Sequence, residues 1–237
     1  MKKIGILIFA RSSSKRYPGK VTQILYRKKT LLEIIYNRIS KKSKNIPIIV
    51  NTSSNKSDDK IALLCKKKNI KFYRGSLKNL IKRTVQCCKK YKLKSFVRVN
   101  ADRPFFDVKV MNKMIKVYLS NDYDIITNQF PRSSPKGLAC EVANTKIFYK
   151  IKNLKLLKSE YEHIFNFFYK RNKYYKIKNF TDKFYKNKKH LNMSIDTKKQ
   201  FKKTKVVYDK INSSSYIDTK FVIKKYERFF KWNWVQL

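Results

Sequence analysis

The sequence predicts an α/β domain with a mostly parallel central sheet flanked by helices. Residues 4–9 form a continuous apolar run rich in β-branched side chains, which is typical of a strand buried on both faces of a parallel sheet. Thr30 and Glu33 have the spacing of a helix capping box, and apolar residues then recur at helical spacing. This pattern of a strand followed by a helix repeats along the first half of the chain, which favours the α/β class.

The elements of the first half follow one another in a regular order. After the helix that begins at Thr30, residues 46–52 read as a second apolar strand. Ser57, Asp58 and Asp59 then open a helix over 57–64, because such side chains cap the first turn. The remaining expected elements are a strand at 70–74, a helix at 77–91, a strand at 95–99, a helix at 107–119 and a strand at 124–127.

The second half of the chain is less regular. It predicts strands at 138–142, 174–180 and 191–195, and helices at 160–171, 198–210 and 219–232. The helix at 160–171 has an aromatic face made of Phe165, Phe168 and Tyr169. We interpret this face as part of the core, because aromatic side chains at helical spacing more often pack inside a domain than form a platform for stacking.

Length and composition favour a single domain. The 237 residues are 42% hydrophobic, and with only 4 Gly and 5 Pro no flexible linker divides them. We therefore expect one domain over 1–237, with the C-terminal helices at about 198–237 as an extension of it.

The charge of the chain is extreme, with 59 Lys and Arg against 15 Asp and Glu, a formal net charge of +44. Such an excess is typical of nucleic-acid-binding proteins, because basic side chains neutralise phosphates and release counterions. Here the lysines are spread along the whole chain, and Ile, Asn, Tyr and Phe are abundant as well, which a bias toward AT-rich codons would produce. We favour this compositional interpretation, and we expect no nucleic-acid partner. A positive field also attracts smaller polyanions such as nucleoside triphosphates.

The four cysteines, Cys65, Cys87, Cys88 and Cys140, form no C-x-x-C pair and have no spacing typical of zinc ligands. We interpret them as reduced thiols of a cytoplasmic protein. No segment has about 18 uninterrupted apolar residues, so the sequence predicts a soluble protein without a membrane span.

Three polar loops follow predicted strands, where ligands bind in sheets of this kind. The first covers residues 11–20 and combines small residues with the cations Arg11, Lys15, Arg16 and Lys20. Small residues let backbone amides approach a ligand, so this composition suits a polyphosphate. The loop is not a P-loop, because it lacks the glycine spacing and the final Lys-Ser/Thr.

The other two loops each contain an aspartate that follows a predicted strand. Asp102 follows the strand at 95–99 and precedes Arg103 and Pro104, a position well suited to holding a hard cation such as Mg²⁺. It could also simply cap or turn the chain. Asp196 follows the strand at 191–195, and from its spacing alone we favour the N-cap of the next helix. If both carboxylates face one pocket, they form a two-carboxylate magnesium site.

Several motifs occur in a fixed order. The first loop contains Arg-x-x-Ser-x-Arg-x-Pro-Gly-Lys, and Arg-Gly then Arg, Arg-x-x-x-Asp-x-Pro-x-x-Asp, Gly-x-x-x-Glu, Glu-His and Asp-Thr follow. The positions are Arg11, Ser14, Arg16, Pro18, Gly19, Lys20, Arg74, Gly75, Arg83, Arg98, Asp102, Pro104, Asp107, Gly137, Glu141, Glu162, His163, Asp196 and Thr197. This order resembles the cytidylyltransferases that make CMP-activated sugars, of the spore-coat polysaccharide, CMP-KDO synthetase and acylneuraminate cytidylyltransferase type. The resemblance covers about residues 4–201.

The resemblance implies a Rossmann-like nucleotide-diphospho-sugar transferase (GT-A-like) fold and a specific reaction. The enzyme would transfer CMP from CTP to an acidic sugar, with Mg²⁺ and release of pyrophosphate, for surface polysaccharide or glycoconjugate biosynthesis; a homodimer is also expected. The implied catalytic residues are Arg11, Lys20 and Asp102, and the magnesium ligands are Asp102 and Asp196. The implied nucleotide-binding residues are Arg11, Ser14, Arg16, Gly19, Lys20, Arg74 and Arg83. Glu141 and His163 would contact the sugar, although His163 equally suits a packed helix position.

The chain departs from the family pattern at two positions. Ala101 replaces the glycine before the metal-loop aspartate, and Gln200 stands where the family often has a second aspartate. These changes are the support for an alternative, a catalytically silent relative that binds nucleotide. A basic nucleic-acid-binding protein, and a nucleotidyltransferase that uses another nucleotide or acceptor, are the remaining alternatives.

Overall fold

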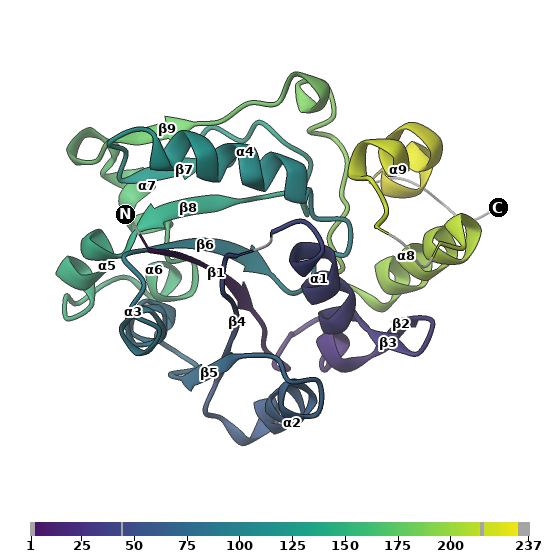
Figure 1. Cartoon of the computed structure of the whole chain (residues 1–237), viewed down its shortest axis with the longest axis horizontal. Coiled ribbons are helices and arrows are strands. Elements are labelled where there is room, and N and C mark those ends of the chain that lie inside the picture. Colours follow the sequence, from purple (N-terminus) through teal and green to yellow (C-terminus); the bar gives the residue numbers. More distant parts are fainter. Residues whose placement is uncertain (1–2, 44, 214–215, 232–237) are drawn as a thin grey trace.

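The computed structural model describes residues 3–43, 45–213 and 216–231 (Figure 1). Within these residues, seven strands form one sheet in the order β5-β4-β1-β6-β8-β7-β9. β1 (Ile4–Phe9) lies between β4 (Ile48–Ser53) and β6 (Ser95–Asn100) and is parallel to both. β5 (Phe72–Gly75) extends the parallel part beside β4. The predicted α/β class with a mostly parallel sheet is confirmed.

The other side of the sheet contains antiparallel pairs. β8 (Glu141–Asn144) is antiparallel to both β6 and β7 (Ile125–Thr127), and β9 (Ile177–Asn179) is parallel to β7 at the edge. The register of β6 and β8 sets Arg98 opposite Glu141. The two side chains therefore reach the same end of the sheet.

Helices cover both faces of the sheet. The first face packs against α1 (Leu31–Ser40), α2 (Asp59–Lys67) and α4 (Val108–Leu119). The second face packs against α3 (Leu80–Lys90), α5 (Thr145–Ile151) and α7 (Asn166–Lys170). β1 shows why a fully apolar strand is needed here: Ile6 and Ile8 lie in the first layer, and Leu7 and Phe9 lie in the second.

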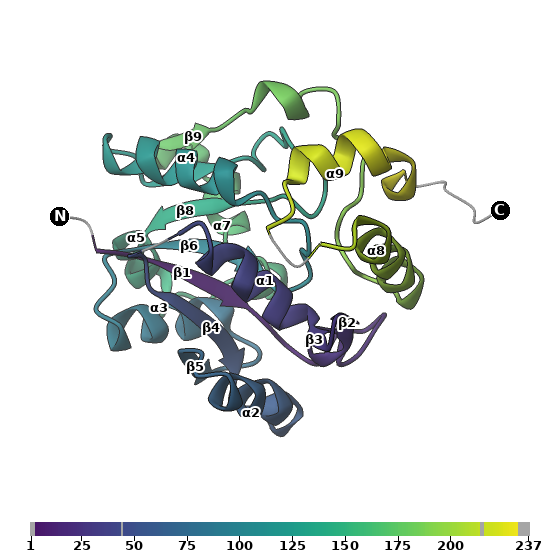
Figure 2. The same ribbon diagram turned by 45° about the vertical axis from the view of Figure 1, so that its right-hand side comes forward.

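The C-terminal helices belong to the first layer. α8 (Lys198–Ile211) lies beside the hairpin of β2 (Ile24–Tyr26) and β3 (Lys29–Thr30), and α9 (Thr219–Tyr226) lies near α8 (Figures 1 and 2). The ring of Tyr208 on α8 stacks on Phe105 with a centroid distance of 4.9 Å. The predicted last helix was too long: α9 ends at Tyr226, a 3-10 helix covers Glu227–Phe230, and Trp232 lies outside the described residues.

The predicted helix at 160–171 is wrong as one element. The structure has α6 (Lys158–Glu162) and α7, with a break at His163. At this break the ring of Phe165 packs against Phe148, with a centroid distance of 5.4 Å, and against Phe96. Tertiary packing of this ring offsets the lost helical hydrogen bonds, which local propensity does not reveal. Phe165 and Phe168 are buried, as expected for a core face.

Three predicted strands also differ from the structure. β8 begins only at Glu141, and β9 covers only three residues of the predicted segment 174–180. The segment 191–195 is not a regular strand: Leu191 forms an isolated bridge with Lys231, and Asn192 forms one with Lys136. Its alternating apolar side chains are buried, which is why the segment resembles a strand in the sequence.

All four cysteines are free and buried, and burial raises the pKa of the Cys65 and Cys88 thiols to about 12. They are therefore poor nucleophiles. In the part of the chain that the structure describes, no helix is long and apolar enough to cross a membrane.

Candidate active site

The loop that follows β1 is held in a compact form. The Ser12 carbonyl accepts hydrogen bonds from the amides of Ser14 and Gly19, and the Ser12 amide donates to the buried carboxylate of Asp58 at 2.6 Å. Gly19 has φ +68° and leads into the 3-10 helix Lys20–Thr22, a left-handed conformation that glycine adopts without strain. The turn at Gly19 is followed by the buried Lys20, whereas the Arg11 side chain at the start of the loop stays partly exposed.

Lys20 joins the two aspartates that the sequence singles out. Its side chain is only 7% exposed, and its ammonium lies 3.3 Å from Asp102 Oδ2 and 3.9 Å from Asp196 Oδ1. The same ammonium donates a hydrogen bond of 2.5 Å to the Ile195 carbonyl. The structure therefore brings Lys20, Asp102 and Asp196 together at the carboxyl ends of β1 and β6, where α/β proteins bind ligands.

Asp196 is surrounded by cations. Its Oδ2 accepts a hydrogen bond of 2.6 Å from Lys136, and Arg16 lies 3.1 Å from its Oδ1. Burial alone would raise the pKa of Asp196, but the hydrogen bond from Lys136 and the nearby charges of Lys136, Lys20 and Arg16 outweigh it. The pKa of Asp196 is therefore lowered, and the carboxylate stays ionised and able to bind a cation.

The expectation that Asp196 caps the next helix is wrong. Thr197 is the N-cap of α8, and its side chain accepts a hydrogen bond from the Gln200 amide. The Gln200 side chain in turn accepts from the amides of Asp196 and Thr197, at 2.7 and 3.0 Å. Gln200 thus completes a capping box, and this arrangement leaves the Asp196 carboxylate pointing toward Lys20 instead of the helix.

The other departure from the family pattern is harmless to the backbone. The Ala101 amide donates to the Phe9 carbonyl at 2.9 Å, and Ala101 does not adopt the positive φ that would require glycine. Arg103 beside it is buried and donates to the Ala139 carbonyl, which fixes the loop that carries Asp102.

Two further arginines that were expected to bind nucleotide make contacts within the protein. Arg74 donates to the carbonyls of Ser53 and Asn55 and pairs with Asp59 at 2.6 Å, so it holds the segment after β4. Arg83 is 1% exposed, and desolvation lowers its pKa to about 10. Its guanidinium lies 6.0 Å from the centroid of the Phe9 ring, and its Nε has no hydrogen-bond partner among the described residues.

A second polar group lies where β6 meets β8. Arg98 Nη1 lies 3.5 Å from Glu141 Oε1, and its guanidinium lies over the rings of Phe9 and Phe165. Glu141 is 3% exposed, and its Oε2 has no hydrogen-bond partner among the residues described. A buried carboxylate oxygen without a donor is costly, so it suits a hydroxyl group supplied by a ligand.

A further ion pair joins the end of α6, beside the helix break at His163, to the loop of residues 11–20. Glu162 ends α6, and its Oε1 accepts a hydrogen bond of 2.6 Å from Arg11 Nη2. This hydrogen bond lowers the pKa of Glu162. His163 is exposed, which argues against the alternative of a packed helix histidine.

The sequence did not predict the partners of three residues in this arrangement, of which only Glu162 belongs to a predicted motif. Asp58 is read from the sequence as a helix-opening residue, but it is fully buried and accepts hydrogen bonds from Ser12 and Ser53. Lys136 carries only the weak signal of standing next to Gly137, and Glu162 only that of standing next to His163. All three roles depend on partners more than 45 residues distant or on the exact path of a loop.

The comparison with known families decides the class of protein. A family model described as cytidylyltransferase matches residues 5–231. The chain belongs to the cytidylyltransferase family. This cytidylyltransferase is 26% identical over 217 residues to the spore coat polysaccharide biosynthesis protein SpsF of Bacillus subtilis, with 89% of this chain and 88% of SpsF covered. It is 32% identical over 203 residues to an uncharacterized protein of Methanocaldococcus jannaschii, with coverage of 85% and 81%.

Solved structures agree with this assignment. A cytidylyltransferase from Leptospira borgpetersenii is 26% identical and matches with a TM-score of 0.89 over 100% of both chains. A CMP:2-keto-3-deoxy-manno-octonic acid synthetase complexed with CTP, 12% identical, has the same fold with a TM-score of 0.66 over 88% of this chain and 99% of that one. The expected Rossmann-like nucleotidyltransferase fold is confirmed, and the protein is a CTP-dependent nucleotidyltransferase.

Proposed function

We propose that this cytidylyltransferase transfers CMP from CTP to a hydroxyl group of an acidic sugar and releases pyrophosphate, for the synthesis of a surface polysaccharide or glycoconjugate. The observation that carries the proposal is the meeting of one buried ammonium, Lys20, with the carboxylates of Asp102 and Asp196. A cation for phosphate oxygens and two carboxylates for a metal then lie at one point of the sheet edge.

The loop after β1 would hold the triphosphate. Lys20 and Arg16 already lie together beside Asp196, and Arg11 is the first residue of the same loop. Fixed cations of this kind stabilise the negative charge that spreads over phosphate oxygens during transfer. Arg11 would exchange its contact with Glu162 for one with a phosphate oxygen, because that ion pair is half-exposed and therefore weak.

Asp102 and Asp196 would hold Mg²⁺. Their side chains are 23% and 11% exposed, and carboxylate oxygens are the ligands that Mg²⁺ prefers. In the described residues no group of three or more His, Cys, Asp or Glu side chains could hold a metal. Two protein carboxylates fit Mg²⁺ nevertheless, since this ion usually takes its other ligands from water and substrate phosphates. When bound, it supplies charge neutralisation at the reacting phosphate.

The reaction is a displacement at the α-phosphorus of CTP. An oxygen of the sugar hydroxyl forms a bond to this phosphorus, the bond to the bridging oxygen of the β-phosphate breaks, and pyrophosphate leaves with the electron pair. The hydroxyl proton passes to solvent. Catalysis would come from orientation of the two substrates and from Lys20 and Arg11 placed against the phosphate oxygens.

The second half of the sheet would bind the acceptor. Arg98 supplies a positive charge, and the buried Oε2 of Glu141 supplies a hydrogen-bond acceptor for a sugar hydroxyl. The names of two similar proteins support a sugar of this type. SpsF is named for spore coat polysaccharide biosynthesis, and the solved structure with a TM-score of 0.66 is named as a CMP:2-keto-3-deoxy-manno-octonic acid synthetase. Arg83 and Arg74 would act on the nucleotide indirectly. Arg83 would supply a buried positive charge, and Arg74 would hold the segment after β4.

Pyrophosphate release tests the proposal. The protein is incubated with Mg²⁺, each of the four nucleoside triphosphates, and a panel of acidic sugars matched with their neutral counterparts. We expect release with CTP and an acidic sugar only. Release with a neutral sugar would contradict the acceptor class. The absence of release with every pair, together with salt-sensitive binding of RNA, would favour the nucleic-acid alternative.

A further inference from the structure

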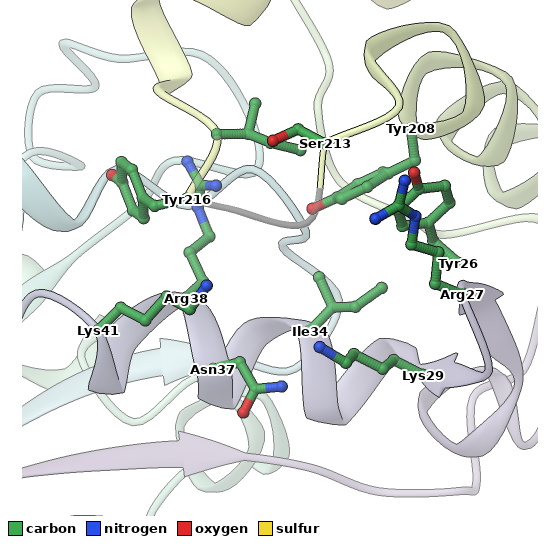
Figure 3. Close-up of a pocket in the computed structure, with 11 residues that line it drawn as sticks. Tyr26, Arg27, Lys29, Ile34, Asn37, Arg38, Lys41, Tyr208, Ser213 and Tyr216 are labelled. Atoms are coloured by element: carbon green, nitrogen blue, oxygen red, sulfur yellow. The ribbon is translucent and has the colours of Figure 1, made fainter.

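A second cavity lies between the β2–β3 hairpin, α1 and the chain around α8 and α9 (Figure 3). It has a volume of about 100 Å³, which is room for several waters and hence for a phosphate-sized anion. It shares no lining residue with the site of Lys20, Asp102 and Asp196. The lining residues that matter here are Tyr26, Arg27, Lys29, Arg38, Tyr208 and Tyr216.

Arg38 is the unusual residue of this cavity. It is 6% exposed, and its Nε and Nη2 donate hydrogen bonds to the Phe106 carbonyl at 2.6 Å and to Thr219 Oγ1 at 2.7 Å. Its guanidinium also lies 4.7 Å from the ring centroid of Tyr216. These partners are all neutral, and across residues 3–43, 45–213 and 216–231 no carboxylate forms an ion pair with Arg38. A buried charge normally has a counter-ion.

The carboxylates near Tyr216 are already engaged elsewhere. Asp107 caps α4 and accepts a hydrogen bond from the Tyr185 hydroxyl. Asp218 caps α9 and pairs with Lys109 at 2.6 Å. Within residues 3–43, 45–213 and 216–231, no carboxylate therefore contacts Arg38 directly.

Further cations line the same cavity. Lys29 reaches from the hairpin toward Ile34 on α1, while Arg38 extends from α1 toward Tyr216 (Figure 3). The turn that precedes Lys29 is held in an unfavourable form: Arg27 and Lys28 have φ of 44° and 59°. Arg27 Nη2 donates to Asn212 Oδ1 at 2.8 Å, which fixes the hairpin against the end of α8. This wall of the cavity is thus a built structure with positive charge.

The cavity walls also hold the loop that follows Asp102. The Tyr208 hydroxyl donates to the Pro104 carbonyl at 2.9 Å, and Thr219 Oγ1 donates to the Phe105 carbonyl at 3.0 Å. Together with the bond from Arg38 to Phe106, three consecutive carbonyls are held from the side of this cavity. The first of them lies two residues after Asp102.

We propose that this cavity is a second anion-binding site, which takes a phosphate-type oxyanion as the counter-ion of Arg38, with Lys29 as a further ligand. The bound anion neutralises the buried guanidinium and stabilises the walls that hold residues 104–106. The site is separate from the triphosphate loop, and it does not depend on the identity of the acceptor sugar.

The test is a calorimetric titration of inorganic phosphate into the full-length enzyme, free of metal and saturated with CTP so that the triphosphate loop is filled. Chloride keeps the ionic strength constant, because screening alone alters the apparent affinity of a very basic protein. The decisive variants are K29M and K28M. Both remove one exposed lysine from the same turn, but only Lys29 lines the cavity.

We expect K28M to bind phosphate as the wild type does, and K29M to bind it about tenfold more weakly, the effect of one charge-assisted hydrogen bond. Phosphate should also raise the melting temperature of the wild type and of K28M but not that of R38M. Equal affinities of K28M and K29M, or an unchanged phosphate effect in R38M, would overturn the proposal. If R38M does not fold, the comparison of K28M with K29M decides alone.

Discussion

The Lys20 ammonium lies between two carboxylates that are 94 residues apart in the chain, Asp102 and Asp196. The ammonium offsets part of the charge of these carboxylates, and in the proposed reaction it would turn toward phosphate oxygens of the substrate. Because Asp196 has three cations around it and Asp102 has fewer, Asp102 is the carboxylate more open to a metal. A substitution of Asp102 therefore tests the proposed metal site.

The substitution D102N should lower the rate of CMP transfer by at least about a hundredfold, since it removes a charge from the reacting centre. The fold should persist, because Lys20 keeps its hydrogen bond to Ile195 and its contact with Asp196. Steady-state pyrophosphate release and thermal melting measure the two effects. The matched control is D122N, which removes an 89% exposed carboxylate far from the site. Equal rates for the two variants would remove Asp102 from the site.

Two glycines offer a matched pair that tests the placement of Lys136. Both have positive φ, but a Cβ at Gly19 meets nothing within 4 Å, whereas one at Gly137 lies 2.5 Å from the backbone of Met193 and Ser194. G19A should cost about 1–2 kcal/mol of stability from backbone strain alone. G137A should cost clearly more and move Lys136 away from Asp196. Urea unfolding of both variants checks this, and equal losses would show that the close approach at Gly137 does not matter.

The residues of the site were only partly predictable from the sequence. The aspartates stand out because each follows a predicted strand in a chain with few acids, so a shared carboxylate site could be suggested, but the contact of both with Lys20 was not predicted. The part played by Gln200 could not, because an N-cap at Thr197 and one at Asp196 differ by one residue in the sequence. Lys136 could not be assigned, since in a chain with 59 basic residues a single lysine carries no signal. Asp58 could not be assigned because its position before a helix suits a cap equally well, and its partner Ser12 is 46 residues away.

At the scale of elements, α1 shows how local sequence and structure agree. The predicted capping box forms: Glu33 Oε2 accepts hydrogen bonds from both the amide and the hydroxyl of Thr30, and the Glu33 amide donates to Thr30 Oγ1. Lys68 adds an ion pair of 2.9 Å to the same carboxylate. Burial alone would raise the pKa of Glu33, but these hydrogen bonds outweigh it, so the pKa is lowered from its ordinary value of 4.5.

This shift predicts a pH dependence of stability. A carboxyl group whose pKa is lowered in the folded state contributes stability that is fully present above pH 4.5 and is lost as the pH falls through the lower folded value. E33Q can still form the capping box but does not titrate. We expect E33Q to be about 1 kcal/mol less stable than the wild type at pH 7 and nearly equal to it in strong acid. Urea unfolding across this range measures the difference, and a gap that is constant with pH would contradict the assignment.

Strongly periodic elements were predictable and irregular ones were not. The strands β1, β4 and β6 and the helices α1, α4 and α8 follow from apolar runs and helical spacing. The break between α6 and α7 did not, because it depends on the packing of Phe165 against rings contributed by other elements. The segment 191–195 has the alternating side chains of a strand, but in the structure it forms only isolated bridges with Lys136 and Lys231. The alternation reflects burial of its apolar side chains and not pairing with a strand.

At the scale of the whole molecule, the net charge of +44 has a consequence for catalysis whatever its origin. A strongly positive field attracts CTP and accelerates its encounter with the site, and dissolved salt screens this field. We expect kcat/KM for CTP to fall by roughly tenfold between low and high ionic strength. Sucrose at matched osmolarity serves as the uncharged control. An unchanged kcat/KM would show that the lysines on the surface do not affect substrate capture.

The proposed reaction takes place where Lys20, Asp102 and Asp196 meet. The most direct measurement is the anomalous scattering of Mn²⁺, used in place of Mg²⁺, in crystals of the CTP complex. We expect a peak bonded to carboxylate oxygens of Asp102 and Asp196 and adjacent to the α-phosphate, with the Lys20 ammonium on phosphate oxygens. A peak on other ligands, or CTP bound away from the loop of residues 11–20, would contradict this proposal.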